Sequence, residues 1–229
     1  MKRKALVTGA SSGIGKSITD VLLEEGWEVH GIGRSFYGES HSPDFHPIVL
    51  DLLDDRSLQN FLKTFDASRL SLLINNAGVA WYGPHETIRT NEIQAMCRTD
   101  LEVPMVITAS FLRRLRETHG TIINISSITA LSPSPHGAAY GAAKAGLLHF
   151  TRTLFEENRK FGMKITALLP DMTDTGLYRH ADFTVSDEDG AALLSETIAE
   201  TVRFILHQPE GTVVTEMALR PQLHRLKRK

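Results

Sequence analysis

The sequence predicts an α/β fold with one doubly wound parallel sheet of about seven strands and helices on both faces. Two observations predict it. Short apolar runs alternate with longer segments whose apolar residues recur every three or four positions, and a glycine-rich turn directly follows the first run. Strands separated by helices are parallel, because each connection crosses over the sheet. The 229 residues contain no linker rich in proline, glycine or serine, so we expect residues 1–229 to form a single domain.

The expected elements follow one another along the whole chain. The strands are expected at residues 5–8, 27–33, 47–50, 70–75, 121–126, 164–169 and 212–217. The helices are expected at residues 14–25, 56–65, 88–117, 139–160 and 192–207. Turn-rich loops are expected at 36–47 and 171–191. Ligands of such sheets bind beyond the carboxyl ends of the strands, so candidate functional residues are sought there.

Composition and charge exclude several function classes. The formal net charge is −2, and the basic ending RLKRK is interpreted as a solvated terminus rather than a nucleic-acid-binding patch. Cys97 is the only cysteine, which excludes a disulfide framework and fits a reducing compartment. We find no signal peptide and no apolar run of about 18 residues. These observations predict a cytoplasmic protein with no nucleic-acid partner, no membrane association and no metal.

The glycine-rich turn "TGASSGIG" spans residues 8–15. Gly9 allows a sharp turn after the first strand, while Gly13 and Gly15 allow close approach of the backbone. The helix that begins there directs free N–H groups at an anion, and a pyrophosphate is a natural ligand. A purely structural loop is the alternative. The spacing G-x-x-x-G-x-G differs from the common dinucleotide pattern G-x-G-x-x-G, and it is not a P-loop.

Three further motifs follow this turn in order: "NNAG" at 75–78, a serine at 127 and "YGAAK" at 140–144. Together with the turn they resemble the short-chain dehydrogenase/reductase family. The resemblance implies a Rossmann-type fold, a nicotinamide cofactor, hydride exchange with a small carbonyl or alcohol substrate, and a homodimer or homotetramer. The residues expected to contact the cofactor are Gly9, Ser11, Ser12, Gly13, Ile14, Gly15, Arg34, Ser35, Asp51, Leu52, Asn76, Ala77, Gly78, Tyr140, Lys144, Pro170, Thr173 and Thr175.

The end of the second strand indicates which dinucleotide binds. Enzymes that prefer NAD usually place an acidic residue there, which accepts a hydrogen bond from the ribose 2′-hydroxyl. Here Gly33 occupies that position and Arg34 follows it. An arginine can bind a 2′-phosphate, so we expect NADP(H) rather than NAD(H), with Ser35 and Ser11 as additional donors. The alternative is that Arg34 is an exposed loop residue.

Two other cofactor contacts have alternative interpretations. By resemblance Asp51 and Leu52 lie beside the adenine, but Asp51 could instead be a turn residue or a helix cap. By resemblance Asn76, Ala77 and Gly78 lie against the cofactor. Asn75 and Asn76 could equally be hydrogen-bonded connections of the sheet.

The predicted chemistry depends on Tyr140, Lys144 and Ser127. Tyr140 and Lys144 are four residues apart on a predicted helix and therefore share a face. A nearby ammonium lowers the pKa of a phenol, so Tyr140 is expected to act as the acid or base. Resemblance adds that Lys144 binds the nicotinamide ribose. Ser127 ends the fifth strand, where its hydroxyl can polarise a substrate carbonyl, and no G-x-S-x-G motif of a serine hydrolase surrounds it.

The sequence departs from the family pattern at two positions. Asp100 stands where the family often has an asparagine that holds a water linked to the lysine, so it is either a shifted fourth member of the catalytic set or a helix-surface aspartate. Asp171 replaces a common glycine after Pro170, although Thr173 and Thr175 still match. The loop 176–191 is expected to cover the pocket as a mobile lid.

Two residues, one in the lid and one in a loop, have two interpretations each, and two alternative functions are considered. Arg179 could meet an anionic substrate or be a surface residue, and His136 could line the pocket or have no role. The main prediction is an NADP(H)-dependent oxidoreductase. The alternatives are a catalytically silent dinucleotide-binding regulator, supported only by the two aspartate departures, and an epimerase or dehydratase on the same scaffold.

Overall fold

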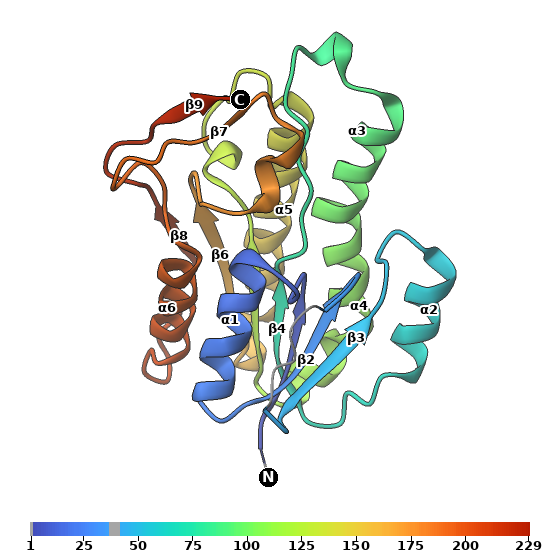
Figure 1. The fold of residues 1–229 in the computed structure, drawn as a ribbon. Coiled ribbons are helices and arrows are strands. Elements are labelled where there is room, and N and C mark those ends of the chain that lie inside the picture. The colour runs from blue at the N-terminus through green and yellow to red at the C-terminus, as the bar shows by residue number, and fades with distance from the viewer. Residues whose placement is uncertain (1, 37–41) are drawn as a thin grey trace.

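A central sheet of seven strands organises the computed structural model, which describes residues 2–36 and 42–229 (Figure 1). The strand order is β3-β2-β1-β4-β5-β6-β8, and every neighbouring pair is parallel. The strands are β1 (Lys4–Thr8), β2 (Glu28–Gly33), β3 (Phe45–Val49), β4 (Leu70–Asn75), β5 (Thr121–Ile125), β6 (Lys164–Pro170) and β8 (Glu216–Leu219). The order reverses between β1 and β4, which is where Rossmann-type sheets bind ligands. The predicted fold class is confirmed.

Helices cover both faces of the sheet. The α-helices are α1 (Gly13–Glu24), α2 (Asp55–Thr64), α3 (Thr90–Cys97), α4 (Val103–Glu117), α5 (Ala138–Asn158) and α6 (Ser195–Leu206). On one face α1 and α6 bury a core against β1, β4 and β5; on the other, α2, α4 and α5 bury a second core. Strands buried on both faces explain why their sequences are almost continuously apolar. In the part of the chain that is described, we find no helix with the length and apolar character needed to cross a membrane.

The long helix expected at 88–117 is interrupted. A π-helical turn, η2 (Arg98–Glu102), separates α3 from α4. Pro104 lies in the first turn of α4 and has no N–H to donate to the carbonyl group of Asp100, four residues earlier. The backbone widens there, and the widened turn holds Asp100 in the interior, fully buried. The π-helical turn beside Pro104 therefore places the Asp100 carboxylate in the interior.

Two predicted strands are displaced. The strand expected at 212–217 begins only at Glu216; just before it, Thr166 Oγ1 donates to the Val214 carbonyl at 2.6 Å and the Ala167 N–H donates to the Thr215 carbonyl at 2.9 Å. Residues 45–49 form β3, although the loop prediction extended to residue 47. Of that predicted loop, residues 37–41 lie outside the described part of the chain.

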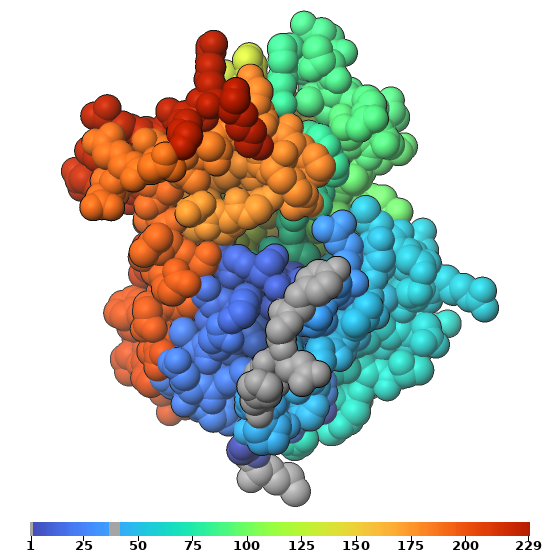
Figure 2. Space-filling view, in the orientation of Figure 1, coloured from blue at the N-terminus to red at the C-terminus, as the bar shows by residue number. Residues whose placement is uncertain are grey.

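The C-terminal residues are not a free solvated tail. β9 (Leu226–Arg228) pairs antiparallel with β7 (Phe183–Val185) inside the segment expected to be a loop. Four short 3-10 turns complete the described structure: η1 (His85–Thr87), η3 (Ile128–Ala130), η4 (Arg159–Phe161) and η5 (Gly176–His180). β9 consists mostly of charged residues and pairs with the lid rather than with the core. The search for apolar periodicity therefore could not predict it. In Figure 2 the red C-terminal segment lies against the orange lid, above the blue α1.

Candidate active site

A cavity of about 560 Å³ lies at the carboxyl ends of the parallel strands. Its lining includes the ends of β1, β2, β4, β5 and β6, part of α5, and the segment after β6. Of the residues predicted for the site, all but Gly15, Ser35 and Asp100 line this cavity. The structure therefore brings together side chains that lie far apart in the sequence, at the edge of the sheet where ligands are expected.

The glycine turn forms one end of the cavity. Gly9 adopts a left-handed conformation with φ of 69°, which a glycine tolerates without strain. A Cβ at Gly15 would lie 2.1 Å from the Gly9 carbonyl oxygen, so Gly15 closes the turn onto itself and does not line the cavity. The Ser12 side chain makes no capping hydrogen bond to α1 within the described chain, and the first turn of α1 has no acidic residue. The helix N-terminus is thus available to an anion.

Hydrogen bonds show structural roles for Asn76 and Asp51, two residues with open interpretations. Asn76 Nδ2 donates to the carbonyl oxygens of Thr8, at 2.9 Å, and Gly9, at 3.3 Å. Its side chain therefore connects two strand ends, although Asn76 also lines the cavity. Asp51 Oδ1 accepts from the Leu53 N–H at 2.9 Å, which is a turn contact. Asp51 and Leu52 still line the cavity, so the structural and binding roles are compatible.

Ser127 and Tyr140 place two hydroxyl groups in the cavity wall. Ser127 follows β5, and its Oγ accepts from the Thr129 N–H at 3.2 Å, which fixes the side chain. Ser126 points elsewhere and donates to the Lys144 carbonyl at 2.9 Å, as strand alternation requires. Tyr140 is buried in the first turns of α5. Ser127 is among the groups that act on the Tyr140 phenol.

Burial raises the pKa of Tyr140 well above its ordinary value, and the negative charge of Asp100 adds to this, while the Ser127 hydrogen bond lowers the pKa by less. Lys144 is not among the groups that shift the pKa of Tyr140 here, so the expectation that Lys144 lowers this pKa stays a prediction. The Lys144 ammonium lies 5.6 Å from the centre of the Tyr140 ring, and its charge is directed at Asp100 instead.

Asp100 is the buried partner of Lys144, so its interpretation as a helix-surface aspartate is wrong. Asp100 Oδ1 lies 3.1 Å from Lys144 Nζ, and Lys144 Nζ donates to the Ile125 carbonyl at 2.9 Å. The Val79 N–H donates to Asp100 Oδ2 at 3.3 Å. Desolvation raises the pKa of Asp100, and the charge of Lys144 opposes that rise. A Cβ at Gly78 would lie 2.8 Å from Asp100 Oδ1, so the glycine makes room for this pair.

Asp171 stands after β6 where the family pattern has a glycine, and its backbone adopts an ordinary conformation there. Its N–H donates to the Leu219 carbonyl at 2.8 Å, and its backbone does not adopt a left-handed conformation. Its carboxylate accepts from the Met172 N–H at 2.8 Å and lies 3.3 Å from His224 Nε2. The replacement is accommodated because the C-terminal segment supplies a partner. The neighbouring Pro170, Thr173 and Thr175 line the cavity as expected.

The segment after β6 covers the cavity, as predicted. Gly176, Leu177, Tyr178, Arg179 and Phe183 all line it. Arg34 also lines the cavity and is exposed, whereas His136 does not belong to the lining. Partial desolvation lowers the pKa of Arg179, and the charge of Arg34 lowers it further, so these two guanidinium groups interact.

Sequence reasoning missed part of the wall. Tyr82, Ser134, His224 and Leu226 line the cavity, and none carried a motif. Tyr82 contacts the Tyr140 ring at 5.9 Å and the Phe183 ring at 5.2 Å between centres. An aromatic residue a few positions after the "NNAG" motif was the one available signal. His224 and Leu226 could not have been placed, because their position depends on the pairing of β9 with β7.

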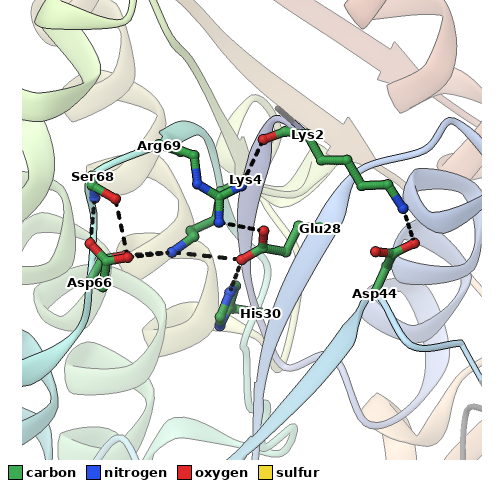
Figure 3. Close-up of polar contacts among 8 residues, drawn as sticks. All are labelled: Lys2, Lys4, Glu28, His30, Asp44, Asp66, Ser68 and Arg69. Carbon is green, nitrogen blue, oxygen red and sulfur yellow. Dashed lines mark hydrogen bonds and ion pairs between the residues drawn. The ribbon is translucent and has the colours of Figure 1, made fainter.

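At the opposite edge of the sheet, Glu28, His30 and His46 bring three potential metal ligands within 4.8 Å of one another. Glu28 is already paired with Arg69 at 2.6 Å and lies 3.7 Å from the Lys4 ammonium (Figure 3). Two cations on the same carboxylate disfavour a third, so this group is better described as a structural ion-pair network.

Comparisons with known proteins agree with this geometry. The family model described as short chain dehydrogenase matches residues 3–184. A serine 3-dehydrogenase of Rhizobium radiobacter is 28% identical, covering 96% of this chain and 94% of its own. An alcohol dehydrogenase from Thermococcus sibiricus, solved with 5-hydroxy-NADP, superposes with a TM-score of 0.87 at 24% identity over 98% of this chain and 99% of its own. A 4-hydroxyisoleucine dehydrogenase solved with NADH superposes with a TM-score of 0.84 at 20% identity over 97% and 98%.

Proposed function

Because the chain belongs to the short-chain dehydrogenase family, we propose that it transfers a hydride between NADP(H) and the carbonyl or alcohol group of a small molecule. The observation that carries the proposal is the presence of two hydroxyl groups, of Ser127 and Tyr140, beside a buried lysine in the wall of one cavity. The glycine turn forms the other end of that cavity, so cofactor and substrate sites are continuous.

The residues at the glycine turn fit a dinucleotide. The N-terminus of α1 has no side-chain cap in the described structure, and the missing side chains of Gly9 and Gly13 leave its N–H groups accessible to a pyrophosphate. Asp51 and Leu52 form the wall proposed for the adenine, and Pro170, Thr173 and Thr175 the wall proposed for the carboxamide. When bound, the nicotinamide supplies or accepts the hydride.

The end of β2 supports a preference for the phosphorylated cofactor. A Cβ added at Gly33 would lie 2.9 Å from Ser11 Cβ. The acidic side chain typical of NAD enzymes therefore has no room at this position. Arg34 lines the cavity next to this position, and no carboxylate in residues 2–36 and 42–229 pairs with it. A guanidinium with free donors binds a phosphate well. Ser11 and Ser35 flank it as possible additional donors.

Tyr140 is the proposed acid in the reducing direction. Its raised pKa keeps the phenol protonated at neutral pH, so it can donate a proton to the substrate oxygen as the carbonyl carbon is reduced. Ser127 donates a hydrogen bond to the same oxygen, which stabilises the negative charge that develops on it. Lys144 compensates the Asp100 charge next to the reacting groups and, by family resemblance, binds the nicotinamide ribose.

We also propose a homodimer or homotetramer in a reducing cellular compartment. The family resemblance supports the oligomer, and Cys97, an exposed free thiol, supports a reducing compartment. Size-exclusion chromatography with light scattering tests the assembly. A monomer at all concentrations would contradict that part of the proposal.

The function is tested by following NADPH oxidation with a panel of aldehydes and ketones, for the wild type and Tyr140→Phe. We expect turnover that falls by about 10²- to 10⁴-fold in the variant. Cofactor binding by the variant, followed by NADPH fluorescence, is the control for folding. Cofactor binding without Tyr140-dependent turnover would favour the silent regulator, and a product formed without net cofactor oxidation would favour an epimerase or dehydratase.

Repeating the assay with NADH tests the cofactor preference. We expect faster turnover with NADPH, and Arg34→Gln is expected to reduce that preference without reducing turnover with NADH. A wild-type preference for NADH would contradict the assignment of Arg34.

A further inference from the structure

The wall of the cavity opposite the glycine turn is built by two segments that are distant in sequence. The lid contributes Tyr178 and Phe183, and the C-terminal segment contributes His224 and Leu226. The two segments are joined as a two-stranded antiparallel ribbon of β7 and β9, in which Val185 pairs with Leu226 and Phe183 with Arg228. Residues opposite each other in such a ribbon share a face, so the register sets which side chains reach the cavity.

Alternation along the C-terminal segment separates two roles. His224 and Leu226, two residues apart, both line the cavity. Arg225 and Lys227, which alternate with them, form ion pairs with Glu188 and Asp187 of the lid. The opposite face of the segment therefore anchors it to the lid, while its inner face is presented to the ligand.

Backbone and side-chain hydrogen bonds fix this segment to the lid. The Ser186 N–H donates to the Arg225 carbonyl at 3.1 Å, and the Lys229 N–H donates to the Asp182 carbonyl at 3.0 Å. Lys229 Nζ donates to the Tyr178 carbonyl at 2.8 Å, in the 3-10 turn η5. Leu226 is thus held in place by contacts on both sides of it.

The part of the cavity wall formed by the lid and the C-terminal segment is mainly apolar. The rings of Tyr82, Tyr178 and Phe183 contact one another, with centres 5.2 to 5.9 Å apart. Leu226 lines the cavity and is 49% exposed. Of the polar groups nearby, Asp171 and the His224 ring lie 3.3 Å from each other, and Arg179 donates to the Gly176 carbonyl at 3.0 Å. An uncharged, apolar group is therefore the ligand that this surface fits.

We propose that Leu226 and Phe183 form an apolar subsite that binds the substituent of the carbonyl substrate, and that Leu226 determines how well long substituents are accepted. The inference rests on the proposed function, because the reacting carbonyl must lie at Ser127 and Tyr140. It assigns a substrate class, carbonyl compounds with an apolar chain or ring, and it gives the C-terminal strand a direct role in specificity.

The test compares reduction of 2-butanone and 2-octanone by the wild type and by Leu226→Ala. We expect the variant to lose about tenfold in kcat/KM for 2-octanone, and less than about twofold for 2-butanone, which is too short to reach the subsite. Leu223→Ala is the matched control: Leu223 is an apolar residue of the same segment, 40% exposed, but it does not line the cavity. It should change neither value.

Equal losses for the two ketones, or no loss for 2-octanone, would overturn the inference while leaving the proposed function intact. If the wild type reduces neither ketone, the proposed function is decided by the wider panel of aldehydes and ketones, and the subsite is tested by saturation-transfer NMR of 2-octanone on the NADPH complex. A signal lost in Leu226→Ala but kept in Leu223→Ala supports the subsite, and equal signals in both variants overturn it. The melting temperature and NADPH affinity of both variants show that the fold and the cofactor site are intact.

Discussion

Two lysines, Lys4 and Lys144, are each only 3% exposed, and they lie toward opposite edges of the central sheet. Lys4 begins β1, and its ammonium donates to the Asp66 carbonyl at 2.7 Å and to Asp66 Oδ2 at 3.1 Å, while Glu28 Oε1 lies at the ion-pair distance of 3.7 Å (Figure 3). Lys144 donates to the Ile125 carbonyl at 2.9 Å, forms an ion pair with Asp100 at 3.1 Å, and faces the cavity.

An ammonium has three N–H donors. Lys4 uses two of them within the protein and Lys144 uses one. A buried lysine beside a carboxylate is therefore not by itself a sign of an active site. The distinguishing features are an adjacent cavity and reactive hydroxyl groups in the same wall, and of these two lysines only Lys144 has both.

The largest expected effect comes from exchanging each lysine for methionine. Lys144→Met leaves Asp100 uncompensated beside Tyr140 and removes a proposed ribose contact, so we expect turnover to fall by about 10²- to 10⁴-fold. Lys4→Met removes the hydrogen bond to the Asp66 carbonyl and an ion pair with the largely exposed Asp66 side chain, so it should lower the free energy of unfolding by about 1 kcal/mol. It should leave kcat/KM of the remaining folded enzyme unchanged. NADPH-dependent turnover and chemical denaturation of both variants measure this, and a large loss of kcat/KM in Lys4→Met would remove the contrast between the two lysines.

A second effect, smaller in free energy, concerns acid stability at the amino edge. Although burial favours the neutral acid, hydrogen bonds from His30 and Arg69 lower the pKa of Glu28 from 4.5 to about 2. Between pH 4.5 and about 2 the unfolded chain takes up a proton that the folded chain does not, so the contribution of Glu28 is present above this window and is lost as pH falls through it. The side chain is 16% exposed, and the contribution is about 3 kcal/mol at most.

Glu28→Gln should therefore be less stable than the wild type at neutral pH, and the difference should shrink as the pH falls through that window. Urea denaturation at several pH values measures it. Glu210→Gln, at an exposed glutamate in a surface turn, is the control and should show no such convergence. A constant difference between Glu28→Gln and wild type at all pH values would mean that the Glu28 carboxylate is not the titrating group.

The same contrast explains how far the sequence predicts this molecule. The sheet, most helices and nearly the whole cofactor end could be predicted, because local signals specify them: apolar runs, glycines and a Tyr–Lys pair four residues apart. The burial of Asp100 could not, since it depends on a π-helical turn caused by Pro104. Nor could the wall at Leu226, because a short charged strand that pairs with a lid carries no hydrophobic periodicity.

The smallest expected effect, and the most specific, is on the pH dependence of Asp100→Asn. Asparagine keeps an acceptor for the Val79 N–H but removes the buried negative charge that helps to raise the pKa of Tyr140. Reduction requires the protonated phenol, so activity falls as pH rises through the pKa of Tyr140. With the charge removed, that pKa is lower, and the loss of activity should begin at a lower pH. Because the phenol stays protonated at neutral pH in both proteins, turnover there should change by only about two- to threefold.

The kcat/KM of wild type and Asp100→Asn, measured across neutral and alkaline pH, distinguishes this electrostatic role from a structural one. A structural defect would lower kcat/KM at every pH and leave the alkaline limb in place. Asp171→Asn is the comparison, because the Asp171 charge acts on Tyr82 and Tyr178 and is not among the causes of the Tyr140 shift. If the alkaline limb of Asp100→Asn stays in place or moves to higher pH, the buried aspartate does not control the acidity of Tyr140, and the Lys144–Asp100 pair becomes a structural pair like that of Lys4.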